Sequence, residues 1–568
     1  MINPELCKER MLSENYMDFI VTDQQLEPFP NLSEEELCKQ NIDLVYDYIA
    51  IENTGGQLLP ELYIHFAIPH CFTLADMEAM NQSGITVIQN YPTLQLKGEG
   101  VIIGVIDTGI DYQNKIFRNL DGTTRIAAIW DQTIQTGTPP QGMLYGSEYT
   151  RDMINQALNS ENPLDVVPSI DEDGHGTFVV SLAAGSAEPS EQFLGAAPEA
   201  TIAVVKLKQA KQYLRDFYII NKDAACYQVT DMLFALKYLN ELALKEGKPL
   251  VTCLAMASNQ GAHASVAPGA ALMEYYANLT NRVLVLGTGN EANQQHHYSH
   301  VVKDLSEVVE VRIDVGRGVK GFTMELWTDI PNIFGVSIVS PSGEEMPQAA
   351  IRGSGGVQRY DFIFERTQVY LKYQLLVEKT NSELIFFRFL SPTPGIWRVR
   401  IRPSKLADGV LHMWLPVKEF LTGDVIFLEA DPYTTMTAPG TSEIPITVSY
   451  YNGADNSIAI SSGRGFTRDN RIKPDFAAPG VNVKGGLPHN RFTVRTGSSI
   501  ATGITAGAAA LLLQWNVYQQ GKAGVDSTQI KNQFILGAQQ KTTESYPNRE
   551  WGYGKLDLYG TLDQMRRY

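Results

Sequence analysis

The sequence predicts an α/β domain with a mostly parallel sheet, interrupted by an inserted β jelly-roll domain and preceded by a small α+β unit. Two stretches of the chain alternate continuous apolar, β-branched runs with helical patterns, which is typical of strands covered on both faces. Between these stretches, short runs with strict apolar and polar alternation are separated by Pro, Gly and Ser turns. Such alternation indicates an antiparallel sandwich or jelly roll.

The composition is that of a globular protein with enough apolar material for more than one core, since 44% of the 568 residues are hydrophobic. Acidic side chains outnumber basic ones by 63 to 46, which gives a formal net charge of −17. This balance argues against a nucleic acid or an anionic membrane as the main partner, because both require a basic surface. The five cysteines lack CxxC spacing, which favours a reducing compartment over a disulfide framework or a zinc site.

The first 75 residues predict the small α+β unit. Residues 42–51 and 61–68 have strand patterns and are joined by the turn-rich segment 53–56. The chain begins with MINPELCKERMLSENYMDFIV, which never reaches the apolar core of a secretion signal. No apolar stretch approaches the roughly 18 residues of a membrane span. We therefore expect no Sec signal, no membrane partner and a protein that is kept inside a cell or a cell-like body.

The α/β domain is predicted to come in two parts, residues 76–300 and 433–568. Four apolar runs of the first part are interpreted as strands of the parallel sheet: 101–107, 201–207, 249–256 and 282–289. Continuous rather than alternating hydrophobicity is the reason for placing them in a sheet that helices cover on both sides.

Residues 301–432 are predicted to form the inserted module. In residues 309–315, apolar positions alternate strictly with charged ones, and the same pattern recurs at 322–326 and 397–401. Because this segment has strands of its own, we expect a compact unit whose two ends lie close together on the α/β domain.

Three glycine-flanked polar motifs lie where a strand or loop ends and a turn or helix begins. Asp107 directly follows an apolar strand, at the carboxyl end of the sheet, where α/β proteins place ligand sites. His175 has glycine on both sides, which suits an imidazole that a substrate must approach. Ser499 opens a helix of small residues. Taken singly, each has a structural alternative, namely a turn-forming Asp, a structural His and an N-cap serine.

In the chain order Asp, His, Ser, these motifs resemble those of the subtilase family of serine endopeptidases. The resemblance covers residues of about 76–300 and 433–568. Further stretches that carry it are GAAPEA at 195–200, GNE at 289–291 and KPDFAAPG at 473–480. It implies a subtilisin-like three-layer domain. Spacing agrees with an insertion, because 209 residues separate Asn290 from Ser499, where about 65 separate the corresponding residues of subtilisin.

The resemblance also assigns roles to these residues. Ser499 would attack the scissile carbonyl, His175 would accept and return the proton, and Asp107 would orient the imidazole. Asn290 matches the side-chain donor of the oxyanion hole, beside the Ser499 backbone N–H. The structural alternative for Asn290 is a residue of a left-handed turn. Neither a cofactor nor a required metal is implied.

The sequence departs from the usual subtilase pattern in two motifs, the one around the nucleophile and the cleft edge. In the nucleophile motif, Ser498 stands where the family commonly has Thr, and Gly503 stands where it has Pro. The cleft edge that pairs with the substrate backbone is commonly Ser-Leu-Gly, and here it is Ala255, Met256 and Ala257. Because a methyl group replaces a glycine hydrogen, we expect a narrower cleft, and peptide binding is the step that this departure affects.

A narrower resemblance is to the Csp germination proteases of clostridia and their relatives. It is carried by GIDYQNKIFRNLDGTTRIAAIWDQTIQTG after Asp107, by YPNREWGYGKLDL at 546–558 and by the inserted module. Proteins of this group process the precursor of a cortex-lytic enzyme during spore germination, and they carry an N-terminal prodomain. The resemblance implies a protein or peptide substrate and a cytoplasmic or spore-associated location. With Asp107 as the anchor, the spacing of the subtilase family implies self-cleavage near residue 76, within 68–90, and an N-terminal unit that occupies the cleft. The alternative is that this unit is a permanent structural cap, and its sequence does not decide between the two.

Two other functions stay open at this point. A pseudoprotease would use the same scaffold only for binding. We rank this function second, because the chain retains all four residues that catalysis needs: Asp107, His175, Ser499 and Asn290. A protein whose only cut is its own would fit the altered edge at 255–257.

A histidine cluster raises the question of a metal site. His296, His297 and His300, with His263 as a candidate neighbour, have no Cys or carboxylate partner at a standard zinc spacing. We therefore expect a hydrogen-bonded polar loop rather than a required metal.

Overall fold

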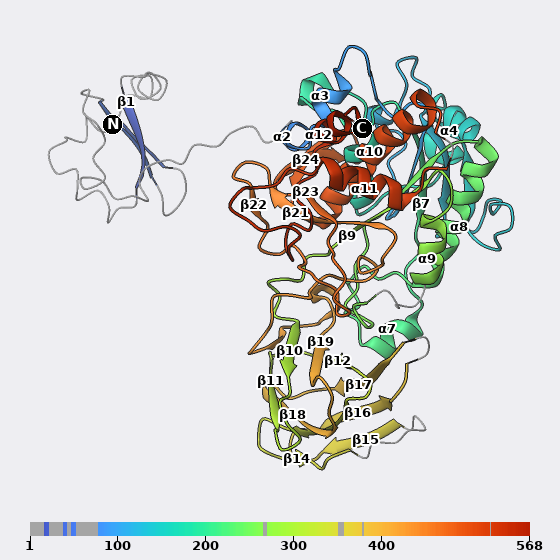
Figure 1. Ribbon diagram of the computed structural model, residues 1–568. Coiled ribbons are helices and arrows are strands. Elements are labelled where there is room, and N and C mark those ends of the chain that lie inside the picture. The colour runs from blue at the N-terminus through green and yellow to red at the C-terminus, as the bar shows by residue number, and fades with distance from the viewer. Residues whose placement is uncertain are drawn as a thin grey trace. The chain divides into compact units, whose positions relative to one another are not determined.

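The computed structural model divides the chain into two compact units, Met1–Leu74 and Ala75–Tyr568. It describes residues 16–21, 38–41, 47–52, 78–264, 270–349, 357–377, 380–522 and 524–567. The first unit, which contains the strand labelled β1 in Figure 1, has an antiparallel sheet with the order β1-β3-β2. Its strands are β1 (Tyr16–Val21), β2 (Cys38–Asn41) and β3 (Asp47–Glu52). The predicted strand 42–51 overlaps β3, and the predicted strand 61–68 lies outside the described residues.

The second unit contains a nine-stranded, mostly parallel sheet with the order β22-β21-β9-β8-β4-β7-β5-β6, and β23 pairs with β21. Only β6 and β22 run antiparallel to their neighbours. The predicted α/β domain is thereby confirmed. The strands are β4 (Ile102–Asp107), β5 (Ile126–Asp131), β6 (Ser147–Thr150), β7 (Thr201–Lys206), β8 (Leu250–Leu254), β9 (Arg282–Gly287), β21 (Ile446–Asn452), β22 (Ser457–Ile458) and β23 (Phe476–Pro479).

Helices pack against both faces of this sheet, which explains the continuous hydrophobicity of its strands. In β4, Ile103 and Val105 belong to the core that α6 and α10 complete, whereas Ile102 and Ile106 belong to the core on the side of α8 and α9. The helices are α2 (Glu78–Gln82), α3 (Ile85–Gln89), α4 (Arg151–Leu158), α5 (Pro163–Val166), α6 (His175–Ala184), α7 (Gln212–Tyr218), α8 (Val229–Glu246), α9 (Ala270–Ala277), α10 (Ser498–Gln514), α11 (Ser527–Gly537) and α12 (Leu558–Met565).

Shorter elements complete this domain. They are the 3-10 turns η3 (Lys115–Phe117) and η4 (Pro189–Glu191), the hairpin β24 (Val483–Leu487) with β25 (Arg491–Arg495), and the π-helical turn η6 (Trp515–Gln519) that continues α10. By length and composition, Ser498–Gln519 could cross a membrane, with a mean hydropathy of 1.3. However, 94% of its apolar window is buried inside the protein, as in the core helix of a globular domain.

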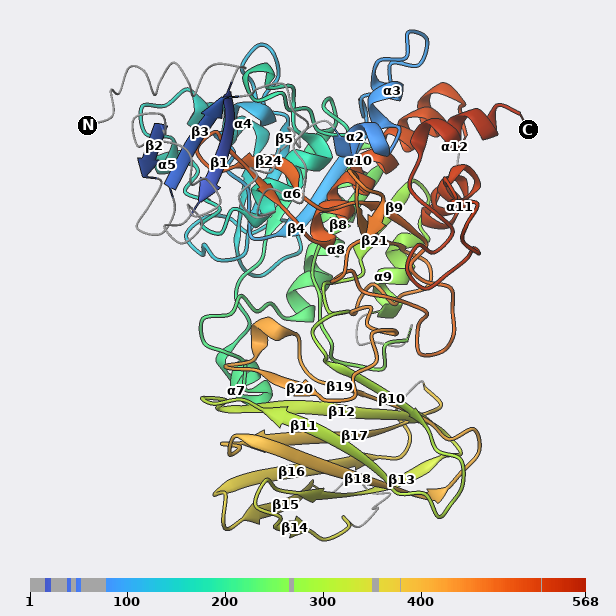
Figure 2. The same cartoon turned by 90° about the vertical axis from the view of Figure 1, so that its left-hand side faces the viewer.

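The inserted segment forms two antiparallel sheets that enclose their own apolar core (Figure 2). One sheet has the order β10-β19-β12-β17-β16-β15, and the other has β14-β13-β18-β11-β20. In β11, the apolar residues at alternate positions all face the core, as the sequence pattern predicts. We call this segment the β-sandwich. Its elements are β10 (His297–Val301), β11 (Val309–Val315), β12 (Gly321–Asp329), β13 (Ile333–Val339), β14 (Glu345–Met346), β15 (Val357–Phe362), β16 (Thr367–Gln374), β17 (Ser382–Leu390), β18 (Gly395–Lys405), β19 (Val410–Trp414), the 3-10 turn η5 (Lys418–Phe420) and β20 (Val425–Phe427).

The β-sandwich begins a few residues before residue 301. Its strand β10 starts at His297 and pairs with β19 along its whole length. Sequence alternation could not place this start, because His297–Val301 has only one strongly apolar side chain at its end.

Candidate active site

Three side chains from distant parts of the sequence meet at the carboxyl end of β4. Asp107 is the last residue of β4, His175 the first residue of α6 and Ser499 the second residue of α10. His175 Nδ1 lies 2.8 Å from Asp107 Oδ1, and His175 Nε2 lies 2.9 Å from Ser499 Oγ. Because a carboxylate only accepts, Nδ1 donates to Asp107 and Nε2 accepts from the Ser499 hydroxyl. The structure thus brings the three residues into one hydrogen-bonded chain.

Glycines allow the segments that carry Asp107 and His175 to touch. Gly174 precedes α6 with a φ of 77°, a left-handed conformation that favours glycine. A Cβ on Gly176 would lie 2.2 Å from the carbonyl oxygen of Gly109, so no larger residue fits at that position. The sequence pattern suggested that these glycines open the imidazole to a substrate. The structure adds a conformational role for Gly174 and a packing role for Gly176.

The charges around His175 favour its protonated form. Asp107 is fully buried, and its Oδ1 also accepts the Thr108 N–H at 2.7 Å. Burial opposes a charge on the imidazole, but the charge and hydrogen bond of Asp107, helped by the charge of Asp173, raise the pKa of His175 above its ordinary value. A higher pKa makes Nε2 a stronger acceptor for the proton of a serine hydroxyl.

Asp171 ties the end of β4 to the start of α6, and sequence reasoning missed it. Its Oδ1 accepts from the Thr108 hydroxyl at 2.8 Å. Its Oδ2 accepts from the hydroxyl and the N–H of Thr177, at 2.6 Å and 2.8 Å. The side chain is buried, so these hydrogen bonds are shielded from water. Its only signal in the sequence is its position as the first residue of the motif DEDGHGT.

Asn290 faces the start of α10. The Ser498 N–H donates to Asn290 Oδ1 at 3.0 Å, which leaves the Nδ2 hydrogens of the amide as donors. The Ser499 N–H lies in the first turn of α10, where N–H groups have no acceptor within the helix. The Ser498 side chain is buried against β9, since a Cβ on Gly287 would lie 3.2 Å from Ser498 Cβ. Ser499, and not Ser498, is therefore directed at the imidazole.

The predicted cleft edge follows β8. Ala255 and Met256 are half-buried and pack against the two cores of the sheet, whereas Ala257 is exposed. The next residue, Ser258, forms an antiparallel bridge with Ala438. The structure therefore places these three residues at the carboxyl end of the sheet, with Ala257 accessible from outside.

The four histidines of the cluster lie near the junction of the β-sandwich and the α/β domain. The prediction of a polar loop is wrong for His297 and His300, which lie on β10. Each histidine has a hydrogen-bond partner: His263 with the Met436 carbonyl, His296 with Glu291, His297 with His412 and His300 with Glu307. Within the described part of the chain, no group of three or more His, Cys, Asp or Glu side chains is placed to hold a metal ion.

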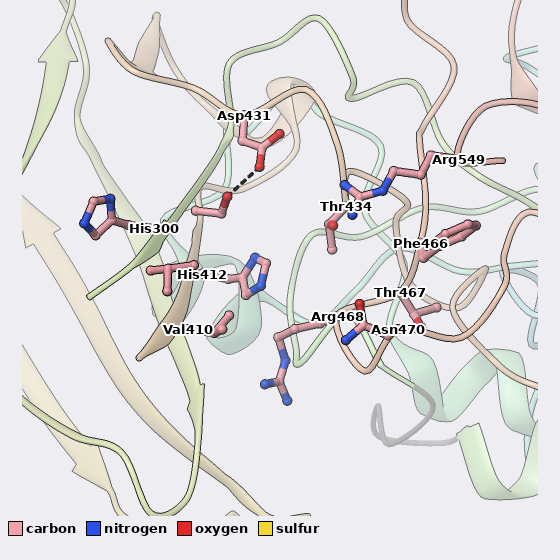
Figure 3. A pocket seen from close by; sticks show the side chains of 12 residues that line it. His300, Val410, His412, Asp431, Thr434, Phe466, Thr467, Arg468, Asn470 and Arg549 are labelled. Atoms are coloured by element: carbon pink, nitrogen blue, oxygen red, sulfur yellow. Dashed lines mark hydrogen bonds between the residues drawn. The ribbon is translucent and has the colours of Figure 1, made fainter. Parts of the chain in front are cut away.

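A cavity of about 480 Å³ lies at the same junction (Figure 3). His300 and His412 line it from the β-sandwich, and Arg468 and Arg549 line it from the α/β domain. Ser499 and its two partners are not among its lining residues, so the cavity is separate from the candidate active site.

Comparison with known proteins agrees with this geometry. The sequence profile described as the subtilase family matches residues 98–337 and 428–554, and the gap between them falls within the β-sandwich. The C5a peptidase of Streptococcus pyogenes is 23% identical over 441 residues, which is 73% of this chain and 35% of that protein. The subtilisin-like protease SBT3.6 of Arabidopsis thaliana is 26% identical over 187 residues, which is 32% of this chain and 23% of that protein. The matches therefore span about a quarter to a third of these relatives.

A solved structure matches over a larger share of both chains. The CspB protease of Clostridium perfringens superposes with a TM-score of 0.76 at 27% sequence identity. The match covers 86% of this chain and 99% of that chain.

Proposed function

This chain belongs to the subtilase family of serine endopeptidases, and from that premise we propose that it hydrolyses peptide bonds with Asp107, His175 and Ser499. The observation that carries the proposal is the continuous hydrogen-bonded chain from the Asp107 carboxylate through the imidazole to the Ser499 hydroxyl. A serine hydroxyl is a weak nucleophile until an adjacent base removes its proton. His175, with a raised pKa, is such a base.

The proposed reaction follows from these positions. Ser499 Oγ attacks the scissile carbonyl while His175 Nε2 takes its proton, and the imidazolium is stabilised by Asp107. The negative oxygen of the tetrahedral intermediate accepts from Asn290 Nδ2 and from the Ser499 N–H. His175 then returns the proton to the leaving amine, and water releases the acyl group by the same steps in reverse. Loss of a donor such as Asn290 costs about 3 to 4 kcal/mol in the barrier.

The substrate class is proposed to be a protein precursor that is cut at a limited number of sites. Similarity to the CspB protease over nearly the whole of that chain supports a protease function. From the resemblance of the sequence to the germination proteases, we propose that the precursor is processed during spore germination. We also propose self-cleavage near residue 76, after which the N-terminal unit stays bound in the cleft. The physical basis for this proposal is that an extended product tail can bind a cleft by strand pairing without an intact peptide bond.

The experiment that tests the proposed nucleophile is labelling with a fluorophosphonate. We expect the wild type and Ser498→Ala to be labelled and Ser499→Ala to remain unlabelled, because only Ser499 contacts His175. Labelling of Ser499→Ala with loss of labelling in Ser498→Ala would contradict the assignment. A wild type that is never labelled would favour the pseudoprotease alternative.

The experiment that tests self-cleavage is denaturing electrophoresis beside size exclusion. The wild type should separate into fragments of about 8 and about 55 kDa, in proportion to 63.0 kDa for the whole chain, and Ser499→Ala should remain intact. The two fragments should elute together in size exclusion. A cut that persists in Ser499→Ala would come from another protease. If the wild type is truncated and the fluorophosphonate does not label it afterwards, the result would favour a protein that cleaves only itself.

A further inference from the structure

Glu291, the residue after Asn290, has a buried carboxylate at the junction with the β-sandwich. The exposed fraction of Glu291 is 5% and that of His296 is 4%. The His296 Nδ1–H donates to Glu291 Oε2 at 2.7 Å. The amide Nδ2 of Asn259 donates to the same oxygen at 3.1 Å. A buried carboxylate with two such donors fixes its own backbone position, because separating the groups leaves them unpaired.

Both donors belong to segments that the β-sandwich holds. The backbone of His296 leads directly into β10, and its carbonyl accepts the Leu415 N–H at 2.9 Å. Leu415 follows β19, and its own carbonyl accepts from Asn259 Nδ2 at 3.2 Å. Glu291, His296 and Asn259 therefore close a ring of hydrogen bonds with the ends of β10 and β19.

The loop that continues from the predicted cleft edge packs on the same face of the β-sandwich. The Gly261 N–H donates to Glu325 of β12 at 2.9 Å. The ring of His263 stacks on Trp414 of β19, with centroids 4.0 Å apart and planes 3° apart. The two segments that border the candidate active site, 255–264 and 288–296, are thus both attached to the inserted β-sandwich.

From these contacts we propose that Glu291 is a positioning residue through which the β-sandwich holds Asn290 at the oxyanion hole. Glu291 touches none of the reacting groups and acts through its neighbour in the chain. The inference rests on the proposed function, since it assigns Asn290 a donor in the reaction. The rate of the catalysed reaction is sensitive to such placement, because a displacement of a catalytic group by about 1 Å can lower that rate by about 100-fold. In this view the contacts that the ends of β10 and β19 make with Glu291, His296 and Asn259 contribute to catalysis.

The kinetic test compares Glu291→Ala with the conservative Glu291→Gln. We expect Glu291→Ala to lower kcat by about 10-fold with KM changed by less than about twofold, because only the transition state uses the oxyanion donors. Glu291→Gln should restore most of the rate, since its carbonyl oxygen can still accept from both donors. The matched control is Glu307→Ala, which removes the carboxylate of a second, solvent-accessible His–Glu pair, His300 with Glu307, and should leave kcat unchanged.

A double-mutant cycle shows whether the effect passes through Asn290. In an Asn290→Ala background, Glu291→Ala should change kcat by less than about twofold, because the donor that it positions is absent. An equal loss of kcat in both backgrounds, or a rise in KM alone, would overturn the proposal.

Hydrogen exchange followed by mass spectrometry measures how firmly the two segments are held by the β-sandwich, and it needs no catalytic turnover. Glu291→Ala should speed exchange in residues 255–264 and 288–296, and Glu307→Ala should not. Unchanged exchange in these two segments would overturn the proposal even if the protein were an active protease. A wild type without turnover would refute the proposed function, and the exchange result would still decide whether Glu291 holds the two segments.

Discussion

At the scale of single residues, the site depends on how two carboxylates, one buried and one exposed, act on one imidazole. Asp107 accepts from Nδ1 of His175, and Asp173 adds charge from the exposed side of the motif. Both raise the pKa of His175 against the opposing effect of burial. Catalysis by general base requires the neutral imidazole, so activity must fall as the pH drops through this raised pKa.

A substitution at Asp173 tests this electrostatic account. Asp173→Asn removes a charge that raises the pKa of His175, so the acid limb of kcat/KM should move to lower pH. The pH profile of peptide hydrolysis at low ionic strength measures the shift. Asp361→Asn, at an exposed ion pair of the β-sandwich, should leave the limb where it is. A shift to higher pH in Asp173→Asn would contradict the sign of the interaction.

Asp171 provides a second prediction at this scale. Asp171→Asn places an amide NH₂ against groups that are themselves donors, so the end of β4 and the start of α6 should separate slightly. We expect kcat/KM to fall by about 10- to 100-fold with the fold retained. Glu172→Gln is the matched control, since its side chain is largely exposed and pairs only with Lys206 in the described structure. Equal effects of the two substitutions would refute the positioning role.

The residues that meet at the site could be predicted because they stand in glycine-flanked motifs at the ends of strands and at the starts of helices. Asp171 and Glu291 could not, because a carboxylate in a loop has no periodic signal. Each also has a remote partner: Thr108 is 63 residues from Asp171, and Asn259 is 32 residues from Glu291. The sequence therefore predicts the catalytic candidates, but it does not predict the side chains that hold them in place.

At the scale of elements, the crossing of α6 and α10 sets the separation of His175 and Ser499. Each helix carries one of these residues at its first turn. Their close approach depends on small residues, since a Cβ on Gly507 would lie 2.3 Å from Ala196 Cβ and 2.6 Å from the Ala183 carbonyl oxygen. The run of Gly and Ala in α10 is therefore a packing requirement of the helix that carries the nucleophile.

Gly507→Ala tests this requirement. The added methyl should overpack the contact and lower the free energy of unfolding by about 1 to 3 kcal/mol. Gly503→Ala is a graded control on the same helix, because its nearest contact would be 3.1 Å, to the Val179 carbonyl oxygen. The gain in helix propensity, about 1 kcal/mol, should offset most of the destabilisation that this milder contact causes. Denaturant unfolding of both variants measures the difference. A Gly507→Ala variant as stable as the wild type would contradict the packing argument.

The apolar runs made the strands of the parallel sheet predictable, and strict alternation did the same for β11, β12 and β18. The junction of the two domains was predictable only in part. His263 was a candidate neighbour of His297, and the structure stacks both rings on Trp414, which no sequence pattern connects with either histidine. Contacts of this kind arise from the tertiary fold and leave no local pattern in the sequence.

At the scale of the whole molecule, this junction should make stability depend on pH. Burial lowers the pKa of His297 to about 4 and holds that of His412 well below its ordinary value, and the charges of Arg468 and Arg549 act on His412 in the same direction. The two rings share a hydrogen bond of 2.9 Å. That bond needs one ring nitrogen without a proton, so protonation of both rings breaks it.

The unfolded chain takes up these protons near pH 6.5, well above the pH at which the folded protein takes them up, so the contribution of His297 and His412 to stability falls as the pH drops from about 6.5 towards 4. The raised pKa of His175 acts in the opposite direction, and the two histidines of the junction outweigh it. The loss should be about 1.4 kcal/mol per pH unit for each histidine that stays neutral. Thermal unfolding of Ser499→Ala at pH 7 and pH 5 measures it without self-cleavage. His412→Gln in that background should reduce the pH dependence. A melting temperature that rises on acidification would contradict the account.

The central claim is that Asp107, His175 and Ser499 act together as a protease site. The most direct measurement is the rate of hydrolysis of unfolded casein, supplied in large excess so that it displaces the cleaved N-terminal unit from the cleft. The wild type should cleave casein, and Ser499→Ala and His175→Ala should each lose at least about 10⁴-fold in kcat. The double variant should be no slower than either single one, because the residues act as a unit. Equal cleavage by the wild type and Ser499→Ala, or single losses that multiply in the double variant, would contradict the claim.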